Sequence, residues 1–355
     1  MRSFESSTGH TRILFGSGTL RRLPEELARF NANHAIVLST PGQAALARRV
    51  QDELGDRAAG LFAGAVMHTP VEVTARAAAY ADQIGADAVV AVGGGSTTGL
   101  GKALASRTGL PQLVLPTTYA GSEVTPVIGE TSDGQKTTRS SPGIQPGTVI
   151  YDVELTLALP WAVSLASAVN AMAHAMEALY AIERTDATDR LAMDALASLS
   201  TGLKELQRSP ASAEARSELL YGAWLAGTCL GTVGMGLHHK LCHTLGGTFG
   251  LPHAPTHTVV LPYVMEYNAP AAPTAMVNAA GALDVAEAPS GMQQLIRSLG
   301  GPTSLFDLGF SATDIPRAAE LATASPYPNP RALTRVVVAD LLERAAVGAP
   351  IEAVR

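Results

Sequence analysis

The sequence predicts two domains, an α/β domain with a mostly parallel sheet followed by an all-α domain. Between residues 35 and 116, short apolar runs alternate with helical patterns, as in parallel strands that are buried on both faces and joined by right-handed crossover helices. From residue 155 onward the pattern is almost entirely helical, with Ala, Leu and Met three or four residues apart. We therefore expect domains at residues 1–156 and 157–355, with Pro160 in the first turn of a long helix.

The elements of the first domain are expected in a regular order. Each strand is a short apolar run, and each helix is a stretch with helical periodicity. In chain order they are an apolar run at 35–39, a helix at 43–54, an apolar run at 60–67, a helix at 71–84, a strand at 88–92, a helix at 100–106, a strand at 112–116 and an apolar segment at 149–152. Such alternation is typical of nucleotide-binding domains.

Composition narrows the class of partner. The chain has 355 residues, of which 46% are hydrophobic and 16% charged, so it is long enough for two domains with substantial cores. A net charge of −6 gives no basic field for nucleic acid or an anionic membrane surface, so a small molecule is the expected partner. Two cysteines without metal-type spacing and an N-terminus without an apolar signal core predict a reduced, cytoplasmic protein.

Two stretches without Asp, Glu, Lys or Arg resemble membrane spans in composition, at residues 155–176 and 219–237. The first contains Pro160, Asn170 and His174, and the second contains five glycines. These residues favour close packing among protein helices, so we expect buried helices here and no membrane partner.

A glycine-rich turn, Gly93-Gly-Gly-Ser96, lies between an expected strand and an expected helix. Backbone N–H groups at such a helix N-terminus accept a pyrophosphate, although a plain strand-to-helix turn is the alternative. A second polar loop, with Thr117, Thr118 and Ser122, follows the next strand. Because the carboxyl ends of parallel strands meet at one edge of a sheet, the two loops together favour a phosphate-binding site.

Five of the nine histidines lie within twenty residues, at positions 238, 239, 243, 253 and 257. Neutral imidazole binds metals, protonated imidazole donates to carboxylates, and either form can transfer a proton near pH 7. Asn170 and His174 are four residues apart and so share one face of a helix. The histidines are the expected place for chemistry.

These motifs together resemble one known family. They are Gly-Gly-Gly-Ser with Lys102, Pro-Thr-Thr followed by Gly121-Ser-Glu, and His239-x3-His243 with His253 fourteen residues after His239. This set is similar to that of the iron-containing alcohol dehydrogenase superfamily, over most of the chain. Longer strings, such as Leu-His-His-Lys-Leu-Cys-His-Thr-Leu-Gly-Gly-Thr-Phe, resemble the maleylacetate reductase branch. The resemblance implies a dinucleotide-binding domain, a helical domain, an active site in the cleft between them, and NADH or NADPH as cofactor.

The resemblance also assigns cofactor contacts. Pyrophosphate and the nicotinamide ribose are expected on Gly94, Gly95, Ser96, Thr117, Thr118 and Ser122, and the ribose also on Lys136. At the end of the first strand an acidic residue would repel the 2′-phosphate of NADPH, whereas this chain has Ser39-Thr40 there. We expect both cofactors to be accepted.

The metal site of the family is altered in this sequence. In metal-dependent members an Asp and a His four apart join two later histidines around a divalent ion, and those positions here read Asn170, His174, His239 and His253. Because Asn is neutral and a weaker donor than carboxylate, we expect no essential metal. The same imidazoles would then bind a dicarboxylate, with His243 as proton donor when maleylacetate is reduced to 3-oxoadipate.

Several alternatives remain open at this point. They are a metal-dependent alcohol dehydrogenase, a related lyase or polyol dehydrogenase of the dehydroquinate-synthase-like kind, and a non-catalytic cofactor-binding protein. Lys102 and either Tyr327 or Asn329 are candidate substrate contacts, although Lys102 alternatively pairs within the first domain and the loop of Tyr327 is alternatively a structural turn. We expect His238 and His257 to hydrogen-bond locally, Cys242 to be a packed thiol, and the protein to be a homodimer.

Overall fold

A computed structural model describes residues 1–132 and 135–352, without the side chains of residues 135 and 136. The chain divides into two compact units. The first unit comprises Met1–Leu159 together with Arg216–Leu220, and the second comprises Pro160–Ala215 and Tyr221–Arg355. The main division thus falls at Pro160, while the short segment 216–220 joins the first unit through contacts that local sequence patterns do not reveal.

The described part of the first unit contains a seven-stranded sheet in the order β1-β2-β9-β6-β5-β3-β4. All neighbouring strands are parallel except β1 and β2, which are antiparallel. The strands are β1 (Phe4–Thr8), β2 (Thr11–Phe15), β3 (Ala35–Leu38), β4 (Ala58–Phe62), β5 (Ala88–Gly93), β6 (Gln112–Pro116) and β9 (Thr148–Tyr151). The expected mostly parallel sheet is therefore confirmed, whereas β1 and β2 were not anticipated.

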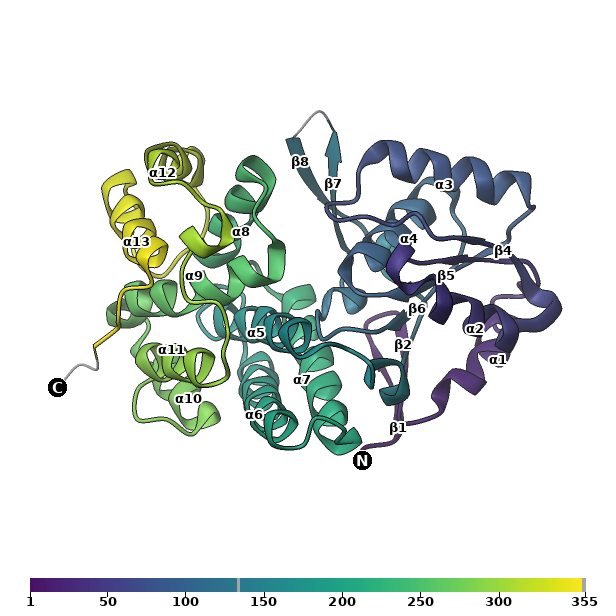
Figure 1. The fold of residues 1–355 in the computed structure, drawn as a ribbon, viewed down its shortest axis with the longest axis horizontal. Coiled ribbons are helices and arrows are strands. Elements are labelled where there is room, and N and C mark those ends of the chain that lie inside the picture. Colours follow the sequence, from purple (N-terminus) through teal and green to yellow (C-terminus); the bar gives the residue numbers. More distant parts are fainter. Residues whose placement is uncertain (133–134, 353–355) are drawn as a thin grey trace. The chain divides into compact units, whose positions relative to one another are not determined.

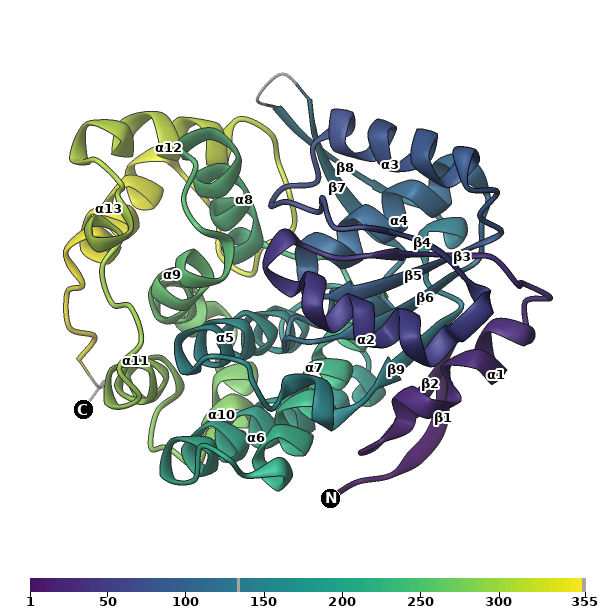
Figure 2. The ribbon, with the colours of Figure 1, turned by 45° about the vertical axis from the view of Figure 1, so that its right-hand side comes forward.

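Helices cover both faces of this sheet, as Figures 1 and 2 show: α1 (Leu23–Ala28) and α2 (Ala44–Leu54) on one face, α3 (Val71–Gln83) and α4 (Gly95–Thr108) on the other. Successive strand residues alternate between the two apolar layers, because side chains along a strand point to opposite faces. Val37 and Val90 pack in the layer with α1 and α2, and Ile36 and Val89 in the layer with α3 and α4. This double burial explains why the strands are continuous apolar runs.

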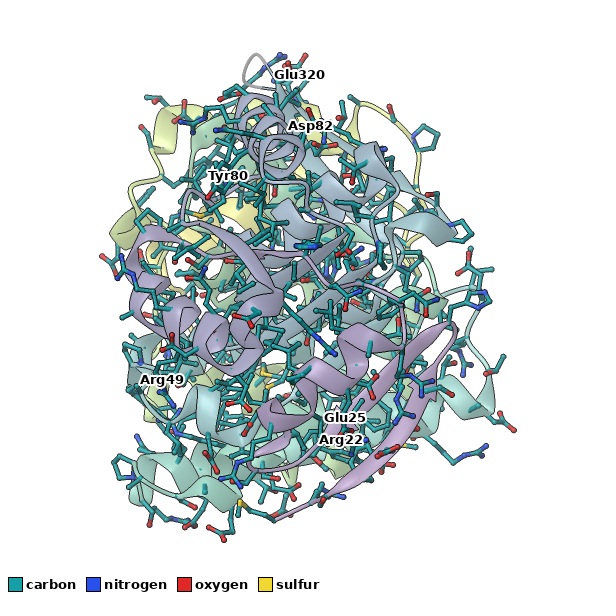
Figure 3. The ribbon with its side chains drawn as sticks, turned by 90° about the vertical axis from the view of Figure 1, so that its right-hand side faces the viewer. Arg22, Glu25, Arg49, Tyr80, Asp82 and Glu320 are labelled. Carbon is teal, nitrogen blue, oxygen red and sulfur yellow. The ribbon has the colours of Figure 1, made fainter. Side chains whose placement is uncertain are left out.

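The first unit also contains an antiparallel hairpin outside the main sheet and ion pairs on its surface. β7 (Val127–Ser132) pairs with β8 (Gln135–Ser140) as a separate hairpin. Near β1 and β2, surface ion pairs join Arg22 to Glu25 at 2.7 Å and to Glu5 at 3.0 Å; Arg22 and Glu25 are labelled in Figure 3. Exposed pairs of this kind contribute at most about 1 kcal/mol each, so the buried apolar layers determine the fold of this unit.

The second unit is built from helices (Figure 1). They are α5 (Trp161–Ala178), α6 (Asp186–Arg208), α7 (Ala213–Thr232), α8 (Leu237–Phe249), α9 (His253–Asn268), α10 (Pro273–Leu283), α11 (Ala288–Ser298), α12 (Ile315–Thr323) and α13 (Arg335–Val347). α5 is central, since every residue from Ser164 to Ala178 is buried, and it packs against α6 and α9. A second core lies among α8, α9, α12 and α13.

The apolar stretches seen in the sequence lie in these helices. In the described part of the chain, no single helix has both the length and the apolarity to cross a membrane. Only α7 and α8 taken together meet that test, and they are bent by 97° at the break between them.

Candidate functional site

The glycine-rich turn forms the N-terminus of α4. β5 ends at Gly93, and the helix begins at Gly95, five residues before the predicted start, so Gly95 and Ser96 belong to its first turn. Its N-cap residue, Gly94, has no side chain that could cap this helix end. A Cβ on Gly93 would lie 2.3 Å from Thr97 Oγ1, whereas a Cβ on Gly95 would meet nothing within 4 Å. The first turn therefore has no capping side chain at its N-cap residue and borders open space at Gly95.

The second polar loop lies against the first, as the sequence predicted. The N–H of Thr117 donates to the carbonyl of Gly93 at 3.1 Å, and a Cβ on Gly94 would lie 2.8 Å from Thr118 Oγ1. Gln43 Nε2 donates to the buried Thr117 hydroxyl at 2.7 Å. Thr118 and Ser122 are half-buried. An uncapped helix N-terminus with open space and nearby hydroxyls fits the phosphates of a dinucleotide.

The expectation that Ser39, at the end of β3, contacts the cofactor has to be corrected. Ser39 is 0% exposed, and within the described chain its hydroxyl has no hydrogen-bond partner. Its backbone instead connects neighbouring strands, because its N–H donates to Phe62 and its carbonyl accepts from Ala65. The half-buried Thr40 is the accessible residue at this strand end. Lys136 lies in β8, but its side chain is outside the described part of the structure.

Lys102 is not placed to bind substrate. Its side chain is 1% exposed, and Nζ donates to the carbonyl of Ser122 at 2.5 Å, the hydroxyl of Thr125 at 2.9 Å and the carbonyl of Val127 at 2.9 Å. Three donors are thus committed inside the protein. Burial lowers the pKa of Lys102 to about 7, against the opposing charge of Glu123. Lys102 therefore fastens the Ser122–Val127 segment to α4.

Three helices, α5, α8 and α9, bring six histidines together in the second unit. His174 Nδ1 and His239 Nε2 are 2.7 Å apart, and Asn170 Nδ2 lies 3.3 Å from His174 Nε2. His239 Nδ1 lies 2.7 Å from a carboxylate oxygen of Glu177. The four residues form a continuous hydrogen-bonded chain in which both ring nitrogens of each histidine have protein partners.

His238 and His257 form a second pair that adjoins the first, with the ring centroids of His239 and His257 5.1 Å apart. His238 Nε2 and His257 Nδ1 are 2.8 Å apart, which confirms the expected local hydrogen bond. Both are 0% exposed, and burial and the neighbouring imidazoles lower their pKa values well below the ordinary value. Cys242 Sγ lies 3.7 Å from His238 Nε2. Burial raises the pKa of this thiol well above its ordinary value, so Cys242 is a packed thiol.

His243 and His253 are the most accessible members of the cluster. Both are half-buried, whereas His174 and His239 are only 4% and 5% exposed. The rings of His243 and His253 are nearly parallel, with centroids 6.5 Å apart and planes 17° apart. A ligand therefore meets His243 and His253 first. The expectation that His174 and His239 bind substrate oxygen directly gives way to a supporting role, because their nitrogens are already engaged.

The four positions that hold a metal in other family members do not fit a dication here. Two nitrogen ligands of a tetrahedral zinc-like ion lie about 3.3 Å apart. The 2.7 Å between His174 and His239 is instead a direct hydrogen bond. The four positions also supply no carboxylate. One other group in the described residues could offer three ligands, His238, Cys242 and His257. His238 Nε2 and His257 Nδ1 are bonded to each other, whereas His238 Nδ1 and His257 Nε2 have no hydrogen-bond partner among the described residues.

Two residues near the cluster come from the loop before α13. Asn329 exchanges two hydrogen bonds with Asn268, at 2.8 and 3.1 Å, and accepts from the N–H of Leu237 at 3.4 Å. It is a structural residue. The hydroxyl of Tyr327 is buried and has no hydrogen-bond partner among the described residues. Burial and the charge of Glu177 raise the pKa of Tyr327, and it stays a candidate substrate contact.

Glu177 was missed by the sequence analysis. Its one available signal is its position three residues after His174, on the same helix face. A buried carboxylate beside a histidine depends on tertiary packing, which local pattern does not show.

Comparison with known proteins agrees with this geometry. Residues 10–153 match the iron-containing alcohol dehydrogenase family, and residues 164–346 match the C-terminal domain of the Fe-containing alcohol dehydrogenase family. Maleylacetate reductase 1 of Rhodococcus opacus is 54% identical over 94% of both chains. A maleylacetate reductase of Rhizobium sp. (strain MTP-10005) is 50% identical over 98% of this chain and 99% of its own.

A solved structure shows the same fold. The crystal structure of maleylacetate reductase from Agrobacterium tumefaciens has a TM-score of 0.92 at 48% identity, covering 99% of this chain and 100% of that one. The chain belongs to the iron-containing alcohol dehydrogenase family of NAD(P)-dependent oxidoreductases, and over nearly its whole length it is similar to the maleylacetate reductases within that family.

Proposed function

We propose that this oxidoreductase reduces the carbon–carbon double bond of maleylacetate to give 3-oxoadipate, with NADH or NADPH, in the breakdown of aromatic compounds. Relatives with that name are about half identical to it over almost the full length. The observation that carries the proposal is the histidine cluster. Its inner pair is satisfied by Asn170 and Glu177, and its outer pair, His243 and His253, is accessible.

The substrate chemistry suits this cluster. Maleylacetate is a dicarboxylate with a ketone conjugated to an alkene, so it requires N–H donors or positive charge at both ends. Imidazole N–H groups of His243 and His253 supply donors on the accessible side. A hydrogen bond to a carboxylate contributes about 1.5–3 kcal/mol, so two such bonds would fix the orientation of the substrate.

The reaction needs a proton donor and a group that stabilises negative charge. When bound, the reduced nicotinamide supplies the hydride that adds to the alkene carbon remote from the ketone. Negative charge then develops on the ketone oxygen of the substrate as an enolate. We assign His253 to this oxygen or to a carboxylate, and His243 to proton donation to carbon. His174 and His239 hold the cluster in place behind them.

Both cofactors should serve, and no metal should be essential. No carboxylate follows β3 to repel the 2′-phosphate of NADPH, because Ser39 and Thr40 occupy that strand end. The hydrogen-bonded His174–His239 pair supports a reaction without a dication. A metal-dependent alcohol dehydrogenase activity is the competing proposal, and the altered metal positions disfavour it.

The test is consumption of NADH and NADPH with freshly generated maleylacetate, by the wild type and by His243→Ala. Loss of a general acid costs about 10²–10⁴-fold in rate, so kcat should fall by at least a hundredfold while KM changes little. A variant with unchanged kcat and a raised KM would assign His243 to binding. A wild type that turns over simple alcohols or aldehydes but not maleylacetate would refute the proposal.

A further inference from the structure

Glu177 is a buried carboxylate in α5 with an unusual set of partners. It is 1% exposed, and its one ion-pair partner among the described side chains is His239. Oε1 accepts from the N–H of His238 at 2.8 Å, and Oε2 accepts from the N–H of Gly236 at 3.0 Å and that of His239 at 3.4 Å. Burying a carboxylate is costly unless it is well hydrogen-bonded, and here backbone N–H groups meet that cost.

These bonds account for the first turn of α8. A helix leaves its first four N–H groups without partners inside the helix. In α8 these belong to residues 236–239, and Glu177 accepts three of them while Asn329 accepts that of Leu237. A Cβ on Gly236 would lie 3.1 Å from Glu177 Oε1 and from the carbonyl of Pro328, so a larger residue would crowd the carboxylate. The helix end is fully occupied by the protein itself.

The same carboxylate determines the tautomer of His239. An ionised carboxylate only accepts hydrogen bonds, so His239 Nδ1, 2.7 Å away, must carry a proton. A neutral His239 then accepts at Nε2 from His174 Nδ1, and His174 accepts at Nε2 from the amide of Asn170. Each bond in the chain therefore has one proton while both rings are neutral. An aspartate at position 170 would place a carboxylate at both ends of this hydrogen-bonded chain. The two histidines would then need one more proton between them, or a bound cation, to satisfy every bond.

We propose that Glu177 is a positioning residue that fixes the tautomer and orientation of His239 and, through the first turn of α8, the placement of His243. His243 lies one helical turn after His239, and the two ring centroids are 6.1 Å apart. Glu177 thus supplies the anionic partner that the four metal positions lack, within the protein and without a bound ion. This proposal rests on the proposed function for its kinetic consequence, but not for its structural one.

The test compares Glu177→Gln with Glu183→Gln. Glu183 is a matched control, because it is exposed and accepts the N–H of Gly234, just before α8, whereas no hydrogen bond within the described chain joins it to a histidine. In Glu177→Gln the amide NH₂ must face an N–H donor. We expect kcat to fall about 10–100-fold, as for other partners that orient functional histidines, with a much smaller change in KM. Glu183→Gln should match the wild type.

The decisive readout is the tautomer of His239, from NMR of ¹⁵N-labelled histidine. The wild type should have a proton on Nδ1 of His239, Glu177→Gln should lose this preference, and Glu177→Asp should restore it together with part of kcat. A wild-type His239 that is bare at Nδ1 would overturn the proposal, even if Glu177→Gln does not fold. A loss of kcat with an unchanged tautomer would also overturn it. Because the spectrum needs no substrate, failure of the proposed function is recognised separately, as absent turnover with the expected tautomer.

Discussion

Helix α4 in the first unit and helix α8 in the second both have a glycine as N-cap residue, Gly94 and Gly236. At α8, Glu177 and Asn329 accept the four N–H groups that the helix leaves unpaired. At α4 the N-cap residue Gly94 has no side chain to cap the helix, and space is open beside Gly95. The unpaired N–H groups of a helix N-terminus are thus bound by an internal carboxylate in the second unit, whereas in the first unit we expect them to bind a ligand.

This difference separates two uses of a helix N-terminus. An internal carboxylate is always present, so it fixes the conformation of neighbouring side chains, here the histidines of α8. An uncapped end keeps its N–H groups and the positive end of its dipole for an anion that arrives in solution. We therefore expect an anion to bind at the N-terminus of α4 rather than at the first turn of α8.

The strongest way to break the comparison is to give α4 an internal carboxylate of its own. In Gly95→Asp the new side chain enters open space, so the fold should be retained. Two like charges about 4 Å apart repel by about 4 kcal/mol at an effective dielectric constant of 20. The Kd of NADH, measured by fluorescence titration, should therefore rise at least a hundredfold, whereas Gly95→Ala should bind within a few-fold of wild type. Equal losses in both variants would mean that shape, not charge, controls this site.

The buried histidines of the second unit, His238 and His257, should control the stability of the protein in mild acid. Burial holds the pKa values of His238 and His257 well below the ordinary 6.5, so the unfolded chain binds more protons than the folded one below that pH. The free energy of unfolding should therefore fall as the pH drops from about 6.5, with a slope approaching about 1.4 kcal/mol per pH unit for each histidine. Urea denaturation from pH 7 to pH 5 measures this slope, and His257→Gln should lower it. An unchanged slope in that variant would show that other groups are responsible.

A smaller effect is expected at Thr40, beside the open site. A carboxylate after β3 accepts from the ribose 2′-hydroxyl of NADH but repels the 2′-phosphate of NADPH. In Thr40→Asp, kcat/KM with NADPH should fall at least tenfold, equivalent to about 1.4 kcal/mol, while that with NADH changes little. Thr40→Asn is the uncharged control. A parallel decrease with both cofactors would show that Thr40 does not face the 2′ position.

Local sequence patterns predicted the central part of the sheet. The runs at β3, β5 and β6 are apolar because both faces are buried, so periodicity and turn residues identify them. The strands of the β7–β8 hairpin were missed because they are largely polar and lack a continuous apolar run. The start of α4 was placed too late because glycines at its first turn have low helix propensity. The apolar run at 60–67 continues beyond β4 as a loop held by backbone bonds to Ser39.

The sequence predicted which histidines belong to the candidate site, but it did not predict what each of them binds. Spacing along the chain grouped Asn170 with His174 and His239 with His243, because residues one turn apart share a helix face. Only the family resemblance joined the two pairs. It did not show that His174 and His239 bind each other, which depends on how α5 packs near α8. Glu177 was not anticipated for the same reason, since its partners lie about sixty residues later in the chain. The burial of Lys102 and Ser39 likewise follows from tertiary packing.

We propose above all that Asn170 and Glu177 satisfy the His174–His239 pair within the protein, so that catalysis needs no dication. The most direct measurement is the initial rate of NADH oxidation with maleylacetate after dialysis of the protein against excess EDTA. We expect the rate to equal that of untreated protein and to stay unchanged on addition of Fe²⁺, Zn²⁺ or Mn²⁺. Loss of turnover on chelation, with recovery on addition of one of these ions, would contradict the claim.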